Sequence, residues 1–216
     1  MMRMDFGCGD GGFLELMPSR LFRDSWLRRY GGHDWVGIDI NPEYVEMARS
    51  RLNNGSDLIV ADGKHLPFID GAFEFIHNSG ALHHMSNYKK GIEEIARVTS
   101  SGGSVYIKEV VNNNPFYKII RRVMGNWRGD DVESFFTSDE LVMEMRKYFL
   151  VDMKCVRYYW RSIFSDSMAY FQKEPRWSLY YCHLISKILS LLRMDEFLCC
   201  HIVVRASRRS DVQRFA

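Results

Sequence analysis

A glycine-rich loop lies near the start of the chain, between the apolar run 2–6 and a helical pattern. The loop covers residues 7–12 and has the sequence GCGDGG. Glycines are needed where a chain turns tightly and where the backbone must approach a ligand without a Cβ atom in the way. The first turn of a helix behind such a loop offers free N–H groups. The loop therefore predicts a tight strand-to-helix turn that can hold a ligand against the backbone.

The remainder of the first half alternates strand-like apolar runs with helical patterns. A helix is expected after Asn41, a good N-cap residue, because Pro42 and Glu43 favour the first helical turn. The strand-like runs cover residues 35–39, 58–61, 73–77 and 105–110, and the helical patterns cover residues 11–30 and 88–98. Alternation of this kind indicates βαβ units and a parallel sheet.

The second half of the chain has a different pattern. Residues 137–140 (TSDE) fit a capping box, so a helix is expected to run from there to about Tyr148. Strand-like stretches cover residues 150–160 and 197–205. Between them lies a helical stretch, 161–195, that is rich in aromatic residues and Met, although a short hairpin would suffice to join the two strands.

Composition excludes several classes of protein. The chain has 216 residues, of which 46% are apolar and 26% charged, which is the balance of a soluble globular domain. Its 29 basic and 27 acidic residues leave a net charge of +2, which disfavours a dedicated nucleic-acid-binding protein. The five cysteines show no CxxC spacing and no secretory leader is visible, so we expect a reducing, cytoplasmic location. The apolar run 179–192 is shorter than the ~20 residues of a membrane span, so no stable membrane insertion is expected.

The glycine loop fits two nucleotide-binding patterns, GxGxG and the dinucleotide pattern GxGxxG. Asp39 ends the second strand-like run, where a carboxylate can accept both hydroxyls of a ribose. Both patterns place a nucleotide-like ligand at the carboxyl ends of parallel strands. The alternative interpretations are a plain tight turn for the loop and a solvent-facing or helix-capping acid for Asp39, although Asn41 already serves as the cap.

Sequence blocks across residues 4–110 together resemble the small-molecule branch of the class I S-adenosylmethionine-dependent methyltransferases. Each block alone is weakly specific, whereas their order and spacing are specific. The chain departs from the family at Ser101, where a Pro is usual, and at Glu74, where an Asp is usual. The blocks are MDFGCGDG (4–11), VGIDI (36–40), ADG (61–63) with LPF (66–68), FEFIHNSGALHH (73–84), and EIARV (94–98) followed by the turn SGG (101–103).

The resemblance implies an α/β fold with a Rossmann-like, doubly wound, mostly parallel seven-stranded sheet and an antiparallel last strand. The aromatic stretch would be a helical insertion, 160–196, between the last two strands. We expect one domain over residues 1–206, with a cofactor-binding half (1–110), a substrate-side part (111–196) and a loose tail (207–216). Family members usually have one or two helices before the first strand, and these helices help to cover the bound cofactor. Either such helices precede the first residue of this sequence, or another part of the chain covers the cofactor.

The resemblance also implies roles for individual residues. Asp39 would bind the ribose hydroxyls of the cofactor, S-adenosyl-L-methionine, with Ile40 packed on the adenine. Asp62 would accept a hydrogen bond from the adenine amino group, and Asn78 would face the methionine portion. The implied cofactor-binding residues are Asp5, Gly7, Cys8, Gly9, Gly11, Asp39, Ile40, Asp62, Gly63 and Asn78.

His83 and His84 would lie near the site of methyl transfer and are the candidate catalytic residues. A general base is needed only if the acceptor is a protonated amine, a hydroxyl or an acidic carbon, and histidine titrates near neutrality. The alternative is that both side chains cap or pack the turn after the fourth strand. The adjacent pair lacks the i,i+4 spacing of a helical metal site, so no metal is expected. The other histidines, interpreted as structural or solvated, are His33, His65, His77, His183 and His201.

The predicted function is in-line transfer of a methyl group from S-adenosyl-L-methionine to a small or lipophilic molecule. Nucleic acid is not expected as the acceptor, because residues 78–81 read NSGA where base-modifying amino methyltransferases have an Asn/Asp-Pro-Pro-aromatic motif. Residues 112–128 and the insertion 160–196 would line the acceptor pocket, although the insertion could instead form a homodimer interface or cover the sheet. Two other functions stay open: an NAD(P)-dependent oxidoreductase that uses the GxGxxG pattern, and a non-catalytic methyltransferase-like partner protein.

Overall fold

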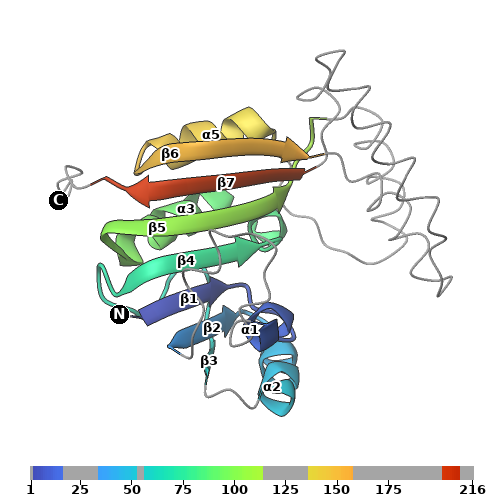
Figure 1. The fold of residues 1–216 in the computed structure, drawn as a ribbon. Coiled ribbons are helices and arrows are strands. Elements are labelled where there is room, and N and C mark those ends of the chain that lie inside the picture. The colour runs from blue at the N-terminus through green and yellow to red at the C-terminus, as the bar shows by residue number, and fades with distance from the viewer. Residues whose placement is uncertain (1, 17–33, 53–55, 114–135, 158–200, 210–216) are drawn as a thin grey trace, which may run out of the picture.

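The computed structural model describes residues 2–16, 34–52, 56–113, 136–157 and 201–209. Its strands are β1 (Met2–Phe6), β2 (Trp35–Asp39), β3 (Asp57–Val60), β4 (Phe73–Ser79), β5 (Thr99–Val110), β6 (Phe149–Arg157) and β7 (His201–Arg208). They form one seven-stranded sheet in the order β3-β2-β1-β4-β5-β7-β6 (Figure 1). The strands from β1 to β5 pair in parallel, whereas β7 is antiparallel to both β5 and β6.

This topology confirms the predicted α/β, Rossmann-like, mostly parallel seven-stranded sheet with an antiparallel last strand. The chain starts at β1, moves outward through β2 to β3 and returns to β4 on the other side of β1, so the strand order reverses between β1 and β4. Open α/β sheets bind ligands at such a reversal, outside the carboxyl ends of the strands. The predicted helical insertion 160–196 lies outside the described residues, as does 210–216 of the predicted tail, and the domain boundaries stay a prediction.

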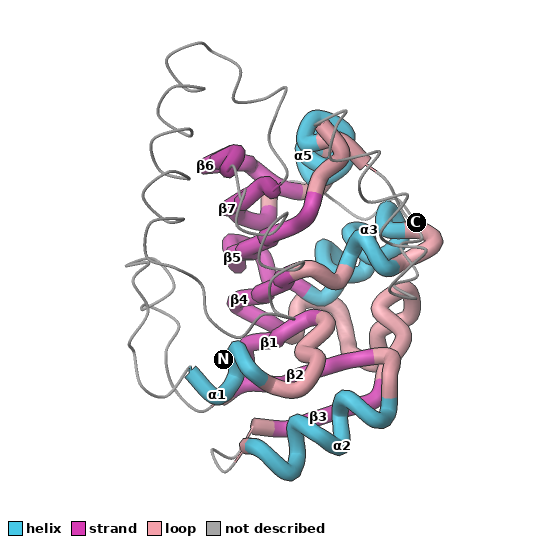
Figure 2. The backbone as a smooth tube through the Cα atoms, turned by 90° about the vertical axis from the view of Figure 1, so that its right-hand side faces the viewer, coloured by secondary structure: helices cyan, strands magenta, loops and turns pink. Residues whose placement is uncertain are grey.

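Helices cover both faces of the sheet. They are α1 (Gly12–Leu16), α2 (Pro42–Arg51), the short 3₁₀ helix η3 (Leu82–His84), α3 (Tyr88–Val98) and α5 (Ser138–Arg146). α3 and α5 lie on one side of the sheet and α1 on the other (Figure 2). The core under α3 and α5 includes Phe73, Ile92 and Leu141, and the core under α1 includes Leu14 and Phe75. Among the described residues, no helix combines the length and apolar character needed to cross a membrane.

The predicted capping box sets the start of α5. The N–H of Glu140 donates to Thr137 Oγ1 at 3.2 Å, and the N–H of Thr137 donates to Glu140 Oε2 at 2.7 Å. The helix ends at Arg146, two residues before the predicted end at Tyr148. The reason is that the N–H of Tyr148 donates to the carbonyl of Met145, three residues back, and such a bond tightens the last turn and closes the helix.

The predicted Ser-Gly-Gly turn is a bulge within β5 and does not precede it. β5 begins at Thr99, directly after α3. Phe73 of β4 pairs with Thr99, but Phe75 pairs with Ser104, so two steps along β4 correspond to five along β5. The extra residues include Gly102, whose φ of +74° lies in the left-handed region that favours glycine. Extra residues in one strand of a pair define a bulge, which bends the strand locally.

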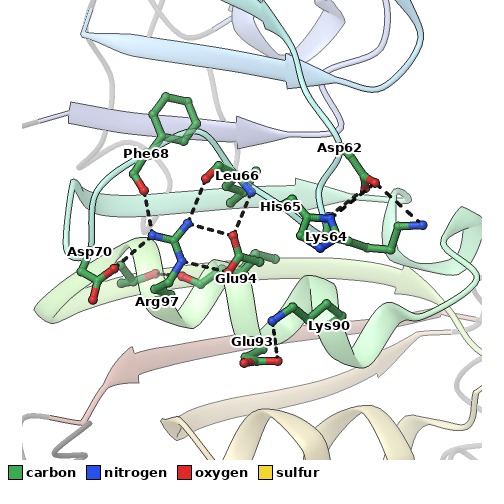
Figure 3. A network of polar contacts seen from close by, with 12 residues as sticks. Asp62, Lys64, His65, Leu66, Phe68, Asp70, Lys90, Glu93, Glu94 and Arg97 are labelled. Carbon is green, nitrogen blue, oxygen red and sulfur yellow. Dashed lines mark hydrogen bonds and ion pairs between the residues drawn. The ribbon is translucent and has the colours of Figure 1, made fainter. Parts of the chain in front are cut away.

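Arg97 on α3 ties down the loop between β3 and β4 (Figure 3). Its Nη1 donates to the Phe68 carbonyl at 2.7 Å and to Asp70 Oδ1 at 3.0 Å, and its Nη2 donates to the Leu66 carbonyl at 2.9 Å. Nε and Nη2 also donate to the two carboxylate oxygens of Glu94, both at 2.8 Å. All five N–H donors of the guanidinium are therefore used. We call Arg97, Glu94 and the loop groups that they bind the Arg97 clamp.

Glu94 completes the Arg97 clamp from the same helix. Its Oε2 also accepts the backbone N–H of Leu66 at 2.8 Å. Burial by itself raises the pKa of Glu94, but the hydrogen bonds from Arg97 and Leu66 outweigh burial and lower the pKa. The clamp therefore holds an ionised carboxylate between a helix and the loop.

Candidate functional site

The glycine loop lies across the carboxyl ends of β1 and β2 and touches the turn after β4. The N–H of Cys8 donates to the carbonyl of Ile38 at 2.8 Å, and the N–H of Gly11 donates to the carbonyl of Cys8 at 3.0 Å. Gly7 has a φ of +71°, and a Cβ atom there would overlap the Cβ of Ala81. Glycine is therefore required at position 7 both for the backbone conformation and for the contact with the turn.

Asp39, at the end of β2, holds this loop through its carboxylate. Its Oδ2 accepts the N–H of Gly9 and its Oδ1 accepts the N–H of Asn41, both at 2.9 Å. Asn41 caps α2, because its own Oδ1 accepts the N–H of Glu43 at 2.8 Å. An ionised carboxylate has about four acceptor positions, so the partly exposed Asp39 can accept two further donors. Ile40, the next residue, is 65% exposed.

The loop is open beside Gly9. A Cβ atom at this glycine would meet no atom of the described residues within 4 Å. Gly9 also has a φ of +52°, which a side chain would strain. The loop therefore presents bare backbone next to the carboxylate of Asp39, which is the arrangement that lets a ligand approach closely.

Cys8 turns its side chain into the protein interior. It is 6% exposed and packs in the core with Leu14 and Trp35. Burial, followed by the charges of Asp5 and Asp39, raises the pKa of its thiol to about 12. A neutral buried thiol is inert, so the predicted contribution of Cys8 to a cofactor site is limited to its backbone and its place in the loop.

Asp5 on β1 forms a buried pair with His77 on β4. The distance from Asp5 Oδ1 to His77 Nδ1 is 2.7 Å, and the two side chains are 3% and 5% exposed. The ring of His77 stacks on Phe13, with centroids 3.5 Å apart, and lies 5.6 Å from the ring of Tyr106. His77 is therefore structural and not solvated, and it fixes one carboxylate oxygen of a predicted cofactor-binding residue.

Asp62 and Gly63 lie after β3, in the loop that the Arg97 clamp holds. Asp62 Oδ1 accepts the N–H of Lys64 at 2.9 Å, and Asp62 Oδ2 lies 3.8 Å from Lys64 Nζ and 3.9 Å from His65 Nδ1 (Figure 3). A Cβ atom at Gly63 would overlap the ring of Phe6. The contact places this segment of the loop directly against the carboxyl end of β1.

Asn78, near the end of β4, is fully buried, and only one end of its amide is paired. Its Nδ2 donates to Glu109 Oε1 at 2.6 Å, while its Oδ1 has no hydrogen-bond partner among the described residues. A flipped amide would set two oxygen atoms against each other. Leaving a buried acceptor unpaired costs about 1–3 kcal/mol. Asn78 Oδ1 is therefore a buried acceptor that a further N–H or O–H donor would stabilise.

Glu109 on β5 is the centre of this buried network and is not among the site residues predicted from the sequence. Its Oε1 accepts the N–H of Leu82 at 2.8 Å as well as the amide of Asn78, and its Oε2 lies 2.7 Å from His83 Nδ1. Burial by itself raises the pKa of Glu109, but the hydrogen bond and charge of His83, together with the bonds from Asn78 and Leu82, lower it. The available sequence signal was an acidic residue inside a largely apolar strand.

The two candidate catalytic histidines have different surroundings. His83 is 8% exposed and is held by Glu109. His84 is exposed, and its ring centroid lies 4.0 Å from that of His83. Both belong to η3, where the ring of His83 is buried in the turn after β4 and that of His84 is not. The carboxylate of Glu109 also orients the His83 ring, which is the arrangement that a general base requires.

The candidate residues gather at the carboxyl ends of β1 to β5. Direct contacts link the glycine loop to Asp39 and to the turn after β4, and Glu109 links Asn78 to His83. Asp62 lies on the neighbouring loop, among its own lysine and histidine partners. Within the part of the chain that the structure describes, no group of three or more His, Cys, Asp or Glu side chains could hold a metal ion.

Comparison with known proteins agrees with the fold and with the glycine loop. The family model described as a methyltransferase domain matches residues 4–107. The tRNA (carboxymethyluridine(34)-5-O)-methyltransferase of Arabidopsis thaliana is 32% identical over 107 residues, which are 48% of this chain and 22% of that protein. The chloroplastic tocopherol O-methyltransferase of the same plant is 23% identical over 166 residues, which are 70% of this chain and 44% of that protein. The chain thus spans less than half the length of either relative.

A solved structure shares nearly the whole fold. It is a chain from the complex between the Haloferax volcanii Trm112 methyltransferase activator and a methyltransferase. The two chains superimpose with a TM-score of 0.67 over 96% of this chain and 82% of the other, at 15% sequence identity. At that identity the likeness concerns the fold alone, and it agrees with the strand order described above.

Proposed function

We propose that this chain transfers a methyl group from S-adenosyl-L-methionine to a small-molecule acceptor. The proposal is supported by the match of residues 4–107 to the methyltransferase-domain model, which agrees with a class I S-adenosylmethionine-dependent methyltransferase. The match to the first curated relative covers 22% of that protein, so the activity, acceptor and partners of the whole protein all belong to this proposal. The cofactor supplies a methyl group on a positively charged sulfur. The protein has to hold the acceptor in line with the C–S bond and exclude water.

The observation that carries this proposal is the bridge that Asp39 makes between the glycine loop and α2. Its remaining acceptor positions suit the two adjacent hydroxyls of a ribose. The exposed apolar side chain of Ile40 follows directly, and the backbone is bare at Gly9. This arrangement fits a nucleoside: the carboxylate would bind the ribose, the apolar side chain would pack on the flat base, and the glycine loop would let the ligand approach the backbone.

Asn78 supports the assignment of the methionine end of the cofactor. Its buried Oδ1 needs a donor, and the α-ammonium group of the cofactor is a donor of the right chemistry. We assign Asp5 and the glycine loop to the same end. Asp62 and Gly63 are assigned to the adenine, because they lie on the loop that packs against the end of β1.

The acceptor that we propose is a small molecule. A net charge of +2 gives no strong basic excess for holding nucleic acid. The relatives differ in the acceptor that their names give, since one is named for tRNA and another for tocopherol. A nucleic-acid acceptor is therefore the alternative. The acceptor segments expected at 112–128 and 160–196 lie almost entirely outside the described residues. A homodimer through the insertion and a cytoplasmic location also stay predictions.

Calorimetric titration with S-adenosylhomocysteine and with NADH tests the proposal against the oxidoreductase alternative. That alternative is not favoured, because the family match includes the glycine loop itself. We expect micromolar binding of S-adenosylhomocysteine and no heat from NADH. Tighter binding of NADH, or no binding of S-adenosylhomocysteine by protein with a cooperative thermal transition, would reject the proposal. A non-catalytic partner protein could bind the cofactor product, and only turnover distinguishes it from an enzyme.

A further inference from the structure

Glu109 is 1% exposed and is surrounded by donors from β4 and η3. The backbone N–H of Leu82 and the side-chain amide of Asn78 both point at Oε1, at 2.8 and 2.6 Å. A backbone N–H can only donate, so Oε1 has to act as an acceptor and cannot carry a proton towards it. The other oxygen, Oε2, is left for His83.

His83 therefore meets this carboxylate as a donor. Its Nδ1 lies 2.7 Å from Glu109 Oε2. Three groups with N–H donors, from Asn78, Leu82 and His83, surround this carboxylate, favour its ionised form and lower its pKa, and an ionised carboxylate only accepts. With the proton held on Nδ1, a neutral imidazole keeps its lone pair on Nε2. A histidine in this state can take a proton from another molecule through Nε2.

The position of this pair relative to the glycine loop is given by two contacts. Ala81, two residues before His83, touches the loop at Gly7. Asn78, whose Oδ1 has no partner among the described residues, shares the carboxylate of Glu109 with His83. The pair therefore lies beside the end of the site assigned to the methionine portion, which carries the methyl group.

We propose that Glu109 is a positioning residue that fixes the tautomer of His83, and that His83 Nε2 accepts the proton of a hydroxyl acceptor during methyl transfer. This inference rests on the proposed function and narrows its acceptor class. A carboxylate acceptor is already anionic at neutral pH and needs no base, whereas a hydroxyl, a protonated amine or an acidic carbon must lose a proton. Of these three classes, the inference commits to the hydroxyl.

The bonds and charges balance in this step. A bond forms between the acceptor oxygen and the methyl carbon, and the C–S bond breaks with its electron pair left on sulfur. The positive charge of the sulfonium is thereby cancelled. The hydroxyl proton moves to His83 Nε2, and the imidazolium is stabilised by Glu109 until the proton passes to water.

Glu109→Gln tests the tautomer with little change in volume. The carbonyl oxygen of Gln would take the place of Oε1, because Asn78 and Leu82 both donate there. Its amide would then donate to His83 Nδ1, so the proton of His83 would move to Nε2 and the lone pair needed by the base would be lost. Glu93→Gln is the matched control, because Glu93 is an exposed carboxylate on α3 that pairs with Lys90 at 3.1 Å.

The measurement is methyl transfer from tritium-labelled cofactor to two probes, 4-methylphenol and 4-nitrophenol, at about pH 8, where the first is protonated and the second largely ionised. We expect Glu109→Gln to lower kcat for 4-methylphenol at least about 100-fold and for 4-nitrophenol by less than about threefold. Glu93→Gln should match the wild-type chain on both probes. Adding Glu109→Gln to His83→Gln should cause no further loss, because both changes remove the same base.

Three outcomes would overturn the inference. One is an equal loss on both probes, which would mean that Glu109 acts only on structure. Another is a wild-type chain that binds S-adenosylhomocysteine but methylates neither phenol, which would contradict methyl transfer to a phenolic hydroxyl. The third is a ¹⁵N spectrum in which neutral His83 carries its proton on Nε2. Failure of the wild-type chain to bind S-adenosylhomocysteine would instead reject the proposed function, so the two failures are distinguishable.

Discussion

Replacing Arg97 with Met is expected to lower the midpoint of thermal unfolding by roughly 6–12 °C. The reason is that about 3 kcal/mol of stability is lost when a partly buried carboxylate loses its cation and two loop carbonyls lose their donor. Met keeps the length of the aliphatic stem but removes all five donors of the Arg97 clamp. The carbonyls of Leu66 and Phe68 lose their donor, and Glu94, whose side chain is 9% exposed, keeps its charge without the cation. Scanning calorimetry at neutral pH measures the effect.

Arg49→Met is the matched control for this prediction. Arg49 is an exposed arginine on α2 that pairs with Glu46 at 3.2 Å and donates to the exposed carbonyl of Leu58 at 3.1 Å. Surface pairs of this kind contribute about 0–1 kcal/mol, so its midpoint should fall by less than about 4 °C. Equal shifts for the two variants would show that the Arg97 clamp contributes no more to stability than a surface ion pair.

Replacing Asp39 with Ala is expected to weaken binding of S-adenosylhomocysteine by at least tenfold, which is about 1.4 kcal/mol. The substitution removes the acceptors assigned to the ribose and also releases the N–H groups of Gly9 and Asn41. Asp39→Asn separates these effects in part, because the amide keeps the volume but turns a donor towards one of the two N–H groups. Calorimetric titration gives the affinity of each variant.

Asp57→Ala controls for the loss of a carboxylate elsewhere on the sheet, since Asp57 is exposed at the start of β3. We expect this variant to bind S-adenosylhomocysteine as the wild-type chain does. If both Asp39 variants fold and bind within about twofold of wild type, a difference of about 0.4 kcal/mol, the ribose assignment is wrong.

Elements that depend on local signals could be predicted from the sequence. The strand at 35–39 and the helix at 88–98 have the predicted bounds. Asn41 and Thr137 cap helices as expected, because a cap is decided by a few adjacent residues. The bulge in β5 could not be predicted, since it depends on the register against β4, a strand some 25 residues earlier in the chain.

The same distinction separates the parts of the candidate site. The glycine loop and Asp39 stand at recognisable positions in contiguous motifs. The partner of His83 is Glu109, 26 residues away, and the partner of Asp5 is His77, 72 residues away. Pairs of this kind form only when the fold brings distant parts of the chain together. The sequence therefore shows the two residues of each pair but cannot predict that they bond to each other. The unpaired oxygen of Asn78 likewise becomes visible only with the packing around it.

The central claim is that the carboxyl ends of β1, β2 and β4 hold one S-adenosylmethionine-like cofactor, and amide chemical shifts test it most directly. In the ¹⁵N-labelled chain, saturating S-adenosylhomocysteine is predicted to cause its largest shifts at Gly9, Asp39, Gly63 and Asn78. Amides of residues 142–146, in the last part of α5 (Ser138–Arg146) and away from its start beside Asn113, should stay in place. No shifts at about 1 mM ligand, or shifts confined to residues away from these strand ends, would contradict the account.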